Sequence, residues 1–434
     1  MNVVKWNELD SAAQSAAIAR GTVAAGPEVR SSVEQTLVLV KTGGDAAVRD
    51  LTERFDGVRR ESLSVSADEV WPRLSRCAQS CGPRSPRLLD GSAHSTRLAW
   101  LRTTPLRRLP AWCERVVRPI PRVGLYVPAG SAPLPSTALM LGIPAQLAGC
   151  PEVVLITPPG PCGAPDAAVL AAAAECGITE IVVAGGAQAI AALAYGTETV
   201  PRCDKIYGPG NAWVTEAKRQ VSTAEGGPGI DMPAGPSEVV VIADAGATAE
   251  FVAADLLSQA EHGPDSQVIL FTNDDDLAGA VIDEVLTQVE ELPRADIARK
   301  ALASSRVIVT RDLAQAFEIS NEYGPEHLIL SLREPRDWLA HVRTAGSVFL
   351  GDWAPETLGD YCSGTNHVLP TAGAARYTGG VNVASFQIAM TVQSVTPAGL
   401  QEVGPCAVEL SEAEQLHAHQ RAVTKRLARL ESES

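Results

Sequence analysis

The first residues whose types and spacing suit chemistry are Gln259 and His262. They lie three positions apart, so on a helix they project from one face. The Gly263-Pro264 that follows ends the helix at that point. An imidazole nitrogen and an amide oxygen that converge at a helix end can hold a zinc ion. A histidine that merely stabilises the C-terminus of the helix is, for these residues alone, the simpler explanation.

A second pair, Glu326 and His327, stands where a loop meets an apolar strand. A carboxylate beside an imidazole at a strand end suits general acid/base catalysis. A turn acid next to a hydrogen-bonded histidine explains the pair equally well. Asp360 is a candidate hard metal ligand, whereas His367, in a loop of small residues, could order that loop by hydrogen bonding.

Two glycine-rich pieces each follow a strand or loop and open a helix, Gly185-Gly-Ala-Gln-Ala and Gly208-Pro-Gly-Asn-Ala. Backbone N–H groups at a helix N-terminus suit a pyrophosphate. Neither piece is the G-x-G-x-x-G fingerprint, and each alone is as often a tight turn. Two of them in succession, followed by residues 231–237 (DMPAGPS), favour a site built from loops.

The C-terminal part offers Glu414 and His419. Ser411 followed three residues later by Glu414 has the form of a capping box, which predicts a helix that begins at Ser411. On that helix the default place for His419 is a solvated face. Residues 370–406, rich in Gly, Ala and Thr, are predicted to be a connection.

From about residue 122 onward, short apolar strands alternate with helical stretches rich in alanine and leucine. Such a pattern indicates parallel sheets covered by helices on both faces, the α/β class. The predicted strands are Val153–Thr157, Glu180–Ala184, Glu238–Ala243, Gln267–Thr272, Arg306–Thr310, His327–Ser331 and Ser347–Gly351. The predicted helices are Ala167–Cys176, Ala187–Tyr195, Ala212–Ser222 and Ala249–Glu261.

Composition narrows the class of protein. A net charge of -15 argues against nucleic-acid binding, which needs a basic surface to neutralise phosphates. The first residues have no apolar core of a signal peptide, and the most apolar stretch, near Ala138 to Cys150, is too short to span a membrane. Nine scattered cysteines fit buried thiols in a reducing cytoplasm better than a disulfide framework.

Residues 71–113 differ from the rest of the chain, because they carry eight arginines against a single acid, Asp90. Five prolines would interrupt any long helix there. A basic arm for a polyanion is one interpretation. A locally diverged surface segment, or a local error of reading frame, fits the composition better.

Nine stretches, in one order between about residues 115 and 370, closely resemble the histidinol dehydrogenase family; the first 70 residues and the tail match it more loosely. They begin at Val123 (VGLYVP), Gly130 (GSAPL), Gly185 (GGAQAIAALA), Gly208 (GPGN), Asp231 (DMPAGPSE), Leu257 (LSQAEHGPDSQ), Tyr323 (YGPEHL), Gly346 (GSVFLGDW) and Ser363 (SGTNHVLP).

The resemblance implies a role for eleven residues. By this match Gln259, His262, Asp360 and His419 are zinc ligands, Glu326 and His327 the acid/base pair, Tyr126, Gln188 and Asn211 the NAD site, and Ser237 and Glu414, with His327 and the zinc ligands, substrate contacts. Glu414 and His419 are implied to come from the partner subunit of a homodimer.

The implied reaction is an NAD-dependent, zinc-dependent four-electron oxidation of L-histidinol, through L-histidinaldehyde, to L-histidine, the last step of histidine biosynthesis. His327 has the pKa range of a base for the hydroxyl proton, and Glu326 suits activation of water for the second oxidation. One zinc ion per subunit would orient the substrate through its imidazole and amino nitrogens, and so act mainly as a template.

The implied architecture is two incomplete Rossmann-like doubly wound domains, a small N-terminal helical piece and a domain-swapped C-terminal tail. The expected boundaries are 1–21 for the helical segment, 22–125 with 237–375 for the domain of the zinc and catalytic residues, 126–236 for the NAD domain, and 376–434 for the dimerisation tail.

Two other functions stay open. One is a paralogue that oxidises another small hydroxyl compound with the same zinc and NAD machinery; Glu414 and His419, which suit an amino- and imidazole-bearing substrate, argue against it. The other is a catalytically silent zinc-binding dimer, against which the full set of expected ligands and both acid/base residues count.

Overall fold

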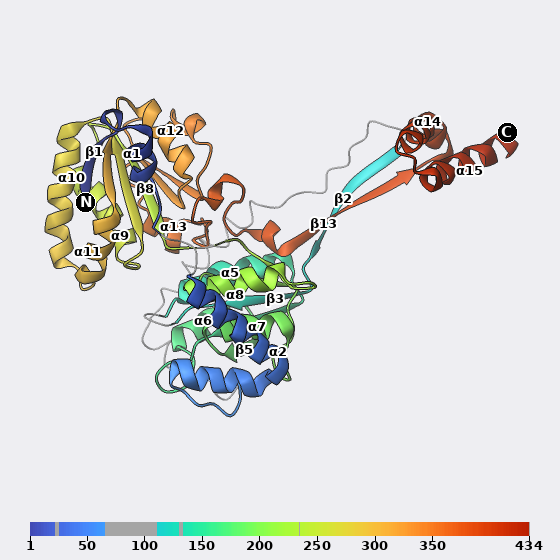
Figure 1. Ribbon diagram of the computed structural model, residues 1–434, viewed down its shortest axis with the longest axis horizontal. Helices are drawn as coiled ribbons and strands as arrows, with labels where there is room; N and C mark the ends of the chain where they lie inside the picture. Colours follow the sequence, from blue (N-terminus) through green and yellow to red (C-terminus); the bar gives the residue numbers. More distant parts are fainter. Residues whose placement is uncertain (22–25, 66–110, 130–132, 234, 434) are drawn as a thin grey trace. The chain divides into compact units, whose positions relative to one another are not determined.

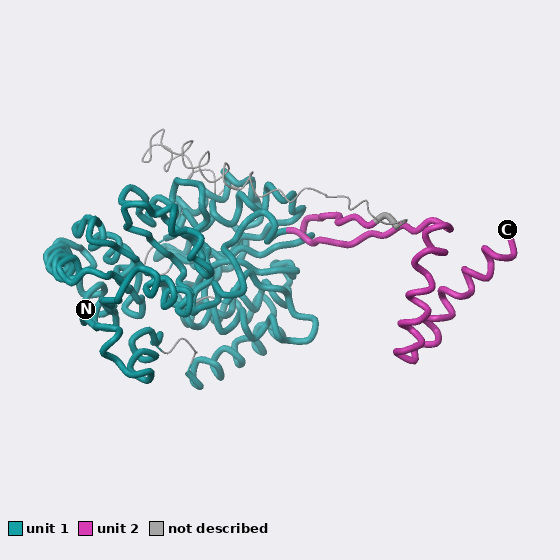
Figure 2. The backbone as a smooth tube through the Cα atoms, turned by 90° about the horizontal axis from the view of Figure 1, so that it is seen from above, with its two compact units in different colours: residues 1–99, 120–386 teal, residues 100–119, 387–434 magenta. Residues whose placement is uncertain are grey.

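The computed structural model describes residues 1–21, 26–65, 111–129, 133–233 and 235–433. The chain divides into two compact units (Figure 2): unit 1 comprises residues 1–99 and 120–386, and unit 2 comprises residues 100–119 and 387–434. The arginine-rich stretch lies outside the described residues except for its last three, which begin a strand of unit 2.

Unit 1 contains two parallel sheets, each with its helices, and we refer to them as the six-stranded and five-stranded lobes (Figure 1). The six-stranded sheet consists, in spatial order, of β1 (Asn2–Lys5), β10 (Arg306–Val309), β9 (Gln267–Thr272), β8 (Glu238–Ala243), β11 (His327–Ser331) and β12 (Ser347–Leu350). All five pairings are parallel. The chain moves outward from β8 through β9 to β10 and then returns to β11 on the other side of β8, which is a doubly wound order.

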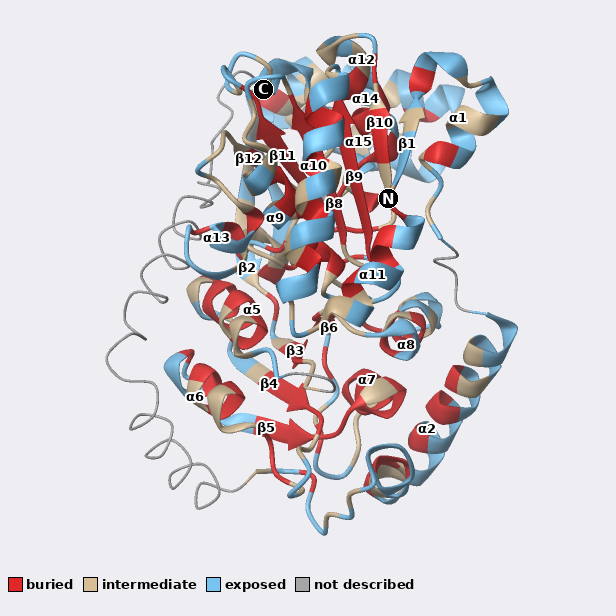
Figure 3. Cartoon of the chain, turned by 90° about the vertical axis from the view of Figure 1, so that its left-hand side faces the viewer, coloured by how far each residue is buried: buried red, intermediate tan, exposed pale blue. Residues whose placement is uncertain are grey.

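The inner strands β9, β8 and β11 are buried along their whole length. Since successive side chains of a strand point to opposite faces, the sheet is covered on both faces there. In β8, Val239 and Val241 pack with α9 (Ala249–Ala260), α10 (Asp275–Gln288) and α11 (Ala295–Ser304). Val240 and Ile242 pack on the other face with α1 (Ser11–Ala17) and α12 (Leu313–Tyr323). The red strands of Figure 3 show this continuous burial. The lobe also contains the short helix α13 (Glu356–Tyr361).

The five-stranded sheet is also parallel and doubly wound. In spatial order it consists of β5 (Glu180–Val183), β4 (Glu152–Thr157), β3 (Arg122–Tyr126), β6 (Lys205–Tyr207) and β7 (Gly229–Ile230), all parallel. Its helices are α2 (Pro27–Asp56), α5 (Pro135–Ala148), α6 (Ala167–Glu175), α7 (Gly186–Tyr195) and α8 (Ala212–Thr223). One face packs with α5 and α6, the other with α2, α7 and α8.

The expected domain boundaries need correction at the N-terminal side. Residues 22–125 were assigned to the domain of the catalytic residues, but α2 packs on α7 and α8, and β3 pairs with β4 and β6 in the five-stranded lobe. The segment 1–21 is not only helical, because β1 pairs with β10 at the edge of the six-stranded sheet. The apolar face of an amphipathic helix can cover either sheet, so chain order was a poor guide to the lobe that α2 joins.

Unit 2 consists of a two-stranded antiparallel ribbon, β2 (Ala111–Pro119) with β13 (Gln387–Val395), and two helices packed on each other, α14 (Pro397–Ala413) and α15 (His417–Glu433). Its C-terminal segment begins at Gln387, because Phe386 still belongs to the core of the five-stranded lobe, where it stacks on Tyr207. The expected tail of 376–434 therefore starts eleven residues too early, and residues 370–406 are not simply a connection.

The prediction that a capping box at Ser411 begins a helix is wrong. The Ser411 hydroxyl donates to the carbonyls of Ala407 and Val408 inside α14, and Glu414 is the C-cap of that helix. The helix begins instead at Thr396-Pro397, where the Thr396 hydroxyl accepts the N–H of Gly399 and proline occupies the first turn.

The α/β class with parallel sheets is confirmed, as are all seven predicted strands and four predicted helices to within one or two residues. Among the described residues, no helix is both long enough and apolar enough to cross a membrane.

Candidate active site

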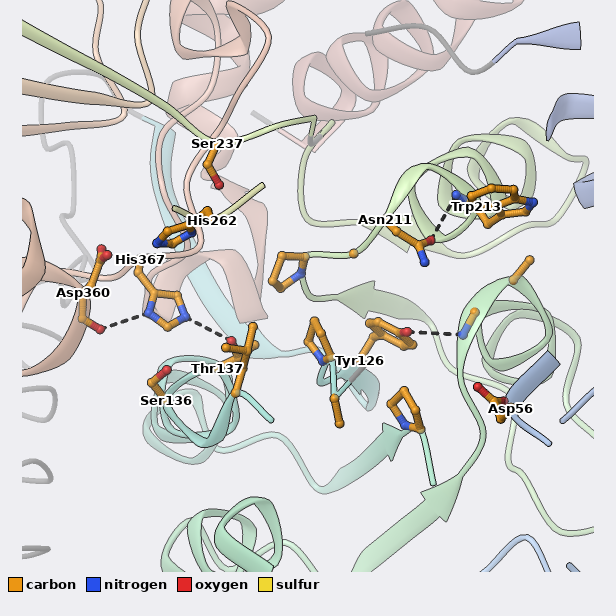
Figure 4. Close-up of a pocket in the computed structure, with 18 of the residues that line it drawn as sticks. Asp56, Tyr126, Ser136, Thr137, Asn211, Trp213, Ser237, His262, Asp360 and His367 are labelled. Carbon is orange, nitrogen blue, oxygen red and sulfur yellow. Dashed lines mark hydrogen bonds between the residues drawn. The ribbon is translucent and has the colours of Figure 1, made fainter. Parts of the chain in front are cut away.

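A cavity of about 800 Å³ in unit 1 is lined by both lobes (Figure 4). Nine of the predicted site residues line it: Tyr126, Gln188, Asn211, Ser237, Gln259, His262, Glu326, His327 and Asp360. The other two, Glu414 and His419, are exposed residues of unit 2, at the end of α14 and in α15. The fold therefore brings together residues that are spread over more than 200 positions of the chain.

The six-stranded lobe contributes residues at the amino ends of its strands. Ser237 directly precedes β8, and Glu326 directly precedes β11, whose first residue is His327. The parallel register places His327 beside Val239, so these strand ends coincide. Gln259 lies in the last turn of α9, the helix that leads to the amino end of β9.

The ring of His327 is fixed by the backbone of Glu238. Its Nδ1 lies 3.1 Å from the Glu238 carbonyl oxygen, to which it donates, and the side chain is 3% exposed. With Nδ1 protonated, the neutral imidazole has its lone pair on Nε2. Nε2 lies 3.5 Å from Oδ1 of Asp360 and has no hydrogen bond to a described residue. This tautomer suits a base that acts on a group in the cavity.

The same peptide positions Glu326. The N–H of Glu238 donates to Oε2 of Glu326 at 2.9 Å, so one residue holds both members of the predicted acid/base pair. Burial raises the pKa of Glu326, while the neighbouring His327 acts to lower it. A buried carboxyl group with a raised pKa can exchange protons near neutral pH.

Glu238 is itself held by residues distant in sequence. Its carboxylate accepts Nε and Nη2 of Arg20 at 2.5 and 2.9 Å and the N–H of Ala372 at 3.0 Å. Arg20 also stacks on the ring of Tyr323, 3.7 Å from its centre. Sequence reasoning missed this network, because Arg20 and Glu238 are 218 residues apart and the stretch that contains Glu238 does not indicate its partner.

Three carboxylates surround His327. Glu326, Glu356 and Asp360 each bring an oxygen within 3.7, 3.9 and 3.5 Å of a ring nitrogen. Burial acts to lower the pKa of His327, but these negative charges outweigh burial and raise it. Glu356 was missed from the sequence, although its place four residues before Asp360 puts both on one helical face.

His367 orders its loop, the structural alternative that the sequence left open. Its Nδ1 bonds the carbonyl oxygen of Asp360 at 3.0 Å, and its Nε2 pairs with Oγ1 of Thr137 at 3.2 Å. Thr137 lies in α5 of the five-stranded lobe, so His367 links α13 to the opposite wall of the cavity (Figure 4).

The five-stranded lobe contributes the carboxyl ends of its strands and the N-termini of its helices. The glycine-rich N–H groups are partly engaged within the protein: Gly186 donates to Tyr126 Oη at 3.2 Å, and Gly208 donates to Asp231 at 2.8 Å. Asn211 caps α8 by accepting the N–H groups of Trp213 and Val214, both at 3.1 Å. Sequence reasoning also missed other side chains of this wall, among them Phe55, Asp56 and Trp213.

The chemistry of the cavity fits a cation. Among the described residues, no cluster of three or more His, Cys, Asp or Glu side chains is arranged to hold a metal ion. Unit 1 supplies only His262 and Asp360 of these types to the predicted ligand set, alongside the amide of Gln259. The buried Nε2 of His327 and Oε2 of Glu356 have no hydrogen-bond partner in the described part of the chain. Carboxylates clustered with unpaired buried acceptors favour a bound positive charge.

Comparison with known proteins identifies the family. The family model described as histidinol dehydrogenase matches residues 20–427. The chain belongs to the histidinol dehydrogenase family. It is 55% identical to the histidinol dehydrogenase of Xanthomonas axonopodis pv. citri (strain 306) over 98% of this chain and 99% of the relative. It is 54% identical to that of Xylella fastidiosa (strain Temecula1), with the same two coverages.

A solved structure agrees. The crystal structure of histidinol dehydrogenase from Elizabethkingia anophelis matches with a TM-score of 0.92 and 42% identity, over 98% of this chain and 97% of that one. Membership of the histidinol dehydrogenase family makes this chain an oxidoreductase, as the sequence predicted.

Proposed function

We propose that this chain oxidises L-histidinol to L-histidine in two successive NAD-dependent steps, with zinc in the same site. The observation that carries the proposal is the buried Glu326–His327 pair, which opens onto a cavity whose opposite wall is built from helix N-termini. Relatives across the full length are named histidinol dehydrogenase.

In the first step, His327 removes the hydroxyl proton through Nε2 while hydride passes to NAD. The hydrogen bond from Nδ1 to Glu238 supports this assignment, because it leaves Nε2 as the acceptor. The three surrounding carboxylates hold a proton on His327 until a positive charge, such as the substrate ammonium, enters among them and lowers its pKa.

In the second step, the aldehyde must be hydrated before it can lose another hydride. Glu326 lies 3.7 Å from the ring of His327, and its Oε2 is fixed by the Glu238 N–H. Its raised pKa suits a carboxyl group that takes a proton from water and later returns it.

For the metal, the proposed ligands are Gln259, His262 and Asp360, completed by His419 of a second copy of the chain. Zinc bound there would hold the imidazole and amino nitrogens of the substrate and act as a template. For NAD, the proposed contacts are Tyr126, Gln188 and Asn211, all on the five-stranded wall.

We also propose a homodimer that shares its sites, in which Ser237 and Glu414 contact substrate and Glu414 comes from the second copy. Unit 2 supports a partner, because Ile388, Met390 and Val392 alternate along β13 and are each more than 40% exposed. A two-stranded ribbon with such an apolar stripe is not expected to be stable alone in water.

The test uses purified full-length protein with zinc, NAD and L-histidinol, and follows NADH. Two NADH per histidinol are expected. Turnover only with other small alcohols would favour the paralogue, and no turnover with any of them would favour the silent protein. Removal of zinc by a chelator should abolish turnover, and added zinc should restore it.

The shared site has its own test, because two inactive variants can complement each other. We expect His327→Asn and His419→Ala to be inactive alone. After mixing and subunit exchange, half the dimers combine both chains and one of their two sites is intact, so about a quarter of the wild-type activity should return. A mixture that stays inactive although exchange is complete would contradict the shared site.

A further inference from the structure

Glu356 is a buried carboxylate that no sequence motif singled out. It begins α13, is 1% exposed, and its Oε1 accepts the hydroxyl of Ser258 at 3.0 Å. A carboxylate is costly to bury unless hydrogen bonds or charges compensate it. Its second partner indicates what it does.

That partner is the side-chain amide of Gln259, which is fully buried. One orientation of the amide satisfies both of its ends: the nitrogen donates to Oε1 of Glu356 at 2.9 Å, and the oxygen accepts the N–H of Glu238 at 3.0 Å. In the opposite orientation the amide oxygen faces a carboxylate oxygen and the NH₂ group faces the N–H of Glu238, and its contacts with Oε2 of Glu326 and Nδ1 of His327 are long, 3.5 and 3.4 Å. Glu356 and Glu238 therefore select one orientation between them.

We propose that Glu356 is a positioning residue, which fixes the amide of Gln259 with its oxygen toward the Glu326–His327 pair. The inference rests on the zinc role proposed above for Gln259. Only the oxygen of an amide can bind a cation, because the nitrogen lone pair is delocalised into the carbonyl. A Gln259 that rotated freely would present its NH₂ group to the metal for part of the time.

The hydrogen bonds of the residue 356 side chain and its negative charge can be tested separately, because both hydrogen bonds end on the same oxygen, Oε1. In Glu356→Gln, the single oxygen can keep both bonds while the charge is lost. In Glu356→Asp, the charge stays but the side chain is one methylene shorter and withdraws from Gln259. If Glu356 acts by positioning, the Glu356→Gln variant should keep more of the zinc affinity than the Glu356→Asp variant. A purely electrostatic role predicts the reverse.

The experiment measures zinc affinity of the metal-stripped full-length variants by competition with a chromophoric chelator, together with their melting temperatures. We expect Glu356→Gln to bind zinc within about threefold of wild type, and Glu356→Asp to bind about tenfold or more weakly, as for other residues that orient metal ligands. Glu216→Gln is the matched control: Glu216 is also buried, at 4% exposure, but pairs with Arg219 in α8 of the other lobe. It should bind zinc like wild type.

Zinc affinity that is lost in the Gln variant and kept in the Asp variant would overturn the inference, as would equal affinities in both. Wild-type protein and Glu216→Gln that bind no zinc would overturn the zinc site itself, and the inference with it. Because both test variants keep a polar side chain of similar size, a loss of fold is not expected; the melting temperatures check this.

Discussion

The two lobes of unit 1 have the same doubly wound sheet but present opposite ends of it to the cavity. The five-stranded lobe presents the carboxyl ends of its strands, and with them the N-termini of α5, α7 and α8. The six-stranded lobe presents the amino ends, and with them the C-terminus of α9. Helix N-termini carry a partial positive charge and C-termini a partial negative one.

The difference gives one cavity two walls of opposite preference. The wall of N-termini favours an anion, such as the diphosphate of a dinucleotide. On the opposite wall, the C-terminus of α9 adds to the carboxylates of Glu326, Glu356 and Asp360, and together they favour a cation, such as a metal ion or a substrate ammonium. The two lobes therefore share a fold but have different proposed ligands: the cofactor on the five-stranded wall and the substrate on the six-stranded wall.

The largest effect that tests this division is expected at His327. In His327→Asn, the amide can still donate to the Glu238 carbonyl, but the acceptor at Nε2 is lost. Loss of a general base lowers turnover by about 10²–10⁴-fold. NADH formation should fall by that factor, while the affinity for NAD, measured by calorimetry, stays within about twofold because the change is confined to the other wall. A parallel loss of NAD affinity would contradict the separation of the walls.

On the five-stranded wall, the largest effect is expected at Gly208. It has φ +122°, and a Cβ there would lie 2.0 Å from the carbonyl oxygen of Tyr126, which the backbone cannot accommodate without moving. Gly208→Ala should lower the free energy of unfolding by about 2–4 kcal/mol, measured by denaturant titration.

Gly57→Ala is the control for Gly208→Ala, since Gly57 also has a positive φ, +68°, but open space around it. It should cost only the strain of that conformation, about 1 kcal/mol. Equal losses in both variants would mean that the close approach to Tyr126 does not constrain the loop.

The residues of the six-stranded wall also differ in how far they could be predicted from the sequence. His262, Glu326 and His327 lie beside glycine, proline or strand signals, so local pattern predicted their elements. It left their chemistry open, and the roles proposed for them come from the resemblance to the family. The roles of Glu238 and Arg20 depend on strand register and on a contact between distant segments, which no local pattern encodes. Glu356 lies between these cases, because its spacing from Asp360 was readable but its burial was not.

The free energy of unfolding should also depend on pH through the carboxyl group of Asp255, in α9 of the six-stranded lobe. Burial, with the charge of Asp352, raises the pKa of Asp255 to about 7. The unfolded chain has the ordinary aspartate value of about 3.9, so its carboxyl group ionises first as pH rises. The stability linked to protonated Asp255 is therefore complete below about pH 4 and is lost as pH rises to about 7.

Asp255→Asn should remove this loss. The variant should exceed wild type by about 2 kcal/mol in free energy of unfolding at pH 8, and the difference should vanish near pH 4. Asp296→Asn, whose side chain is 95% exposed, should show no such dependence. A gain that is the same at both pH values would show that the charge of Asp255 is not its cause.

The smallest effect distinguishes capping from cofactor binding at Asn211. Its side chain accepts two N–H groups at the start of α8, and Asp caps helices as well as Asn does. Asn211→Ala should lower the free energy of unfolding by about 1 kcal/mol. Asn211→Asp should keep wild-type stability within about 0.5 kcal/mol, yet weaken NAD binding about tenfold, because a negative charge then stands where an anion is expected. If the Asp variant bound NAD as tightly as wild type, the dinucleotide would not lie on the wall of helix N-termini. The two lobes would then differ in the strand ends that they present to the cavity, but not in the charge that they prefer.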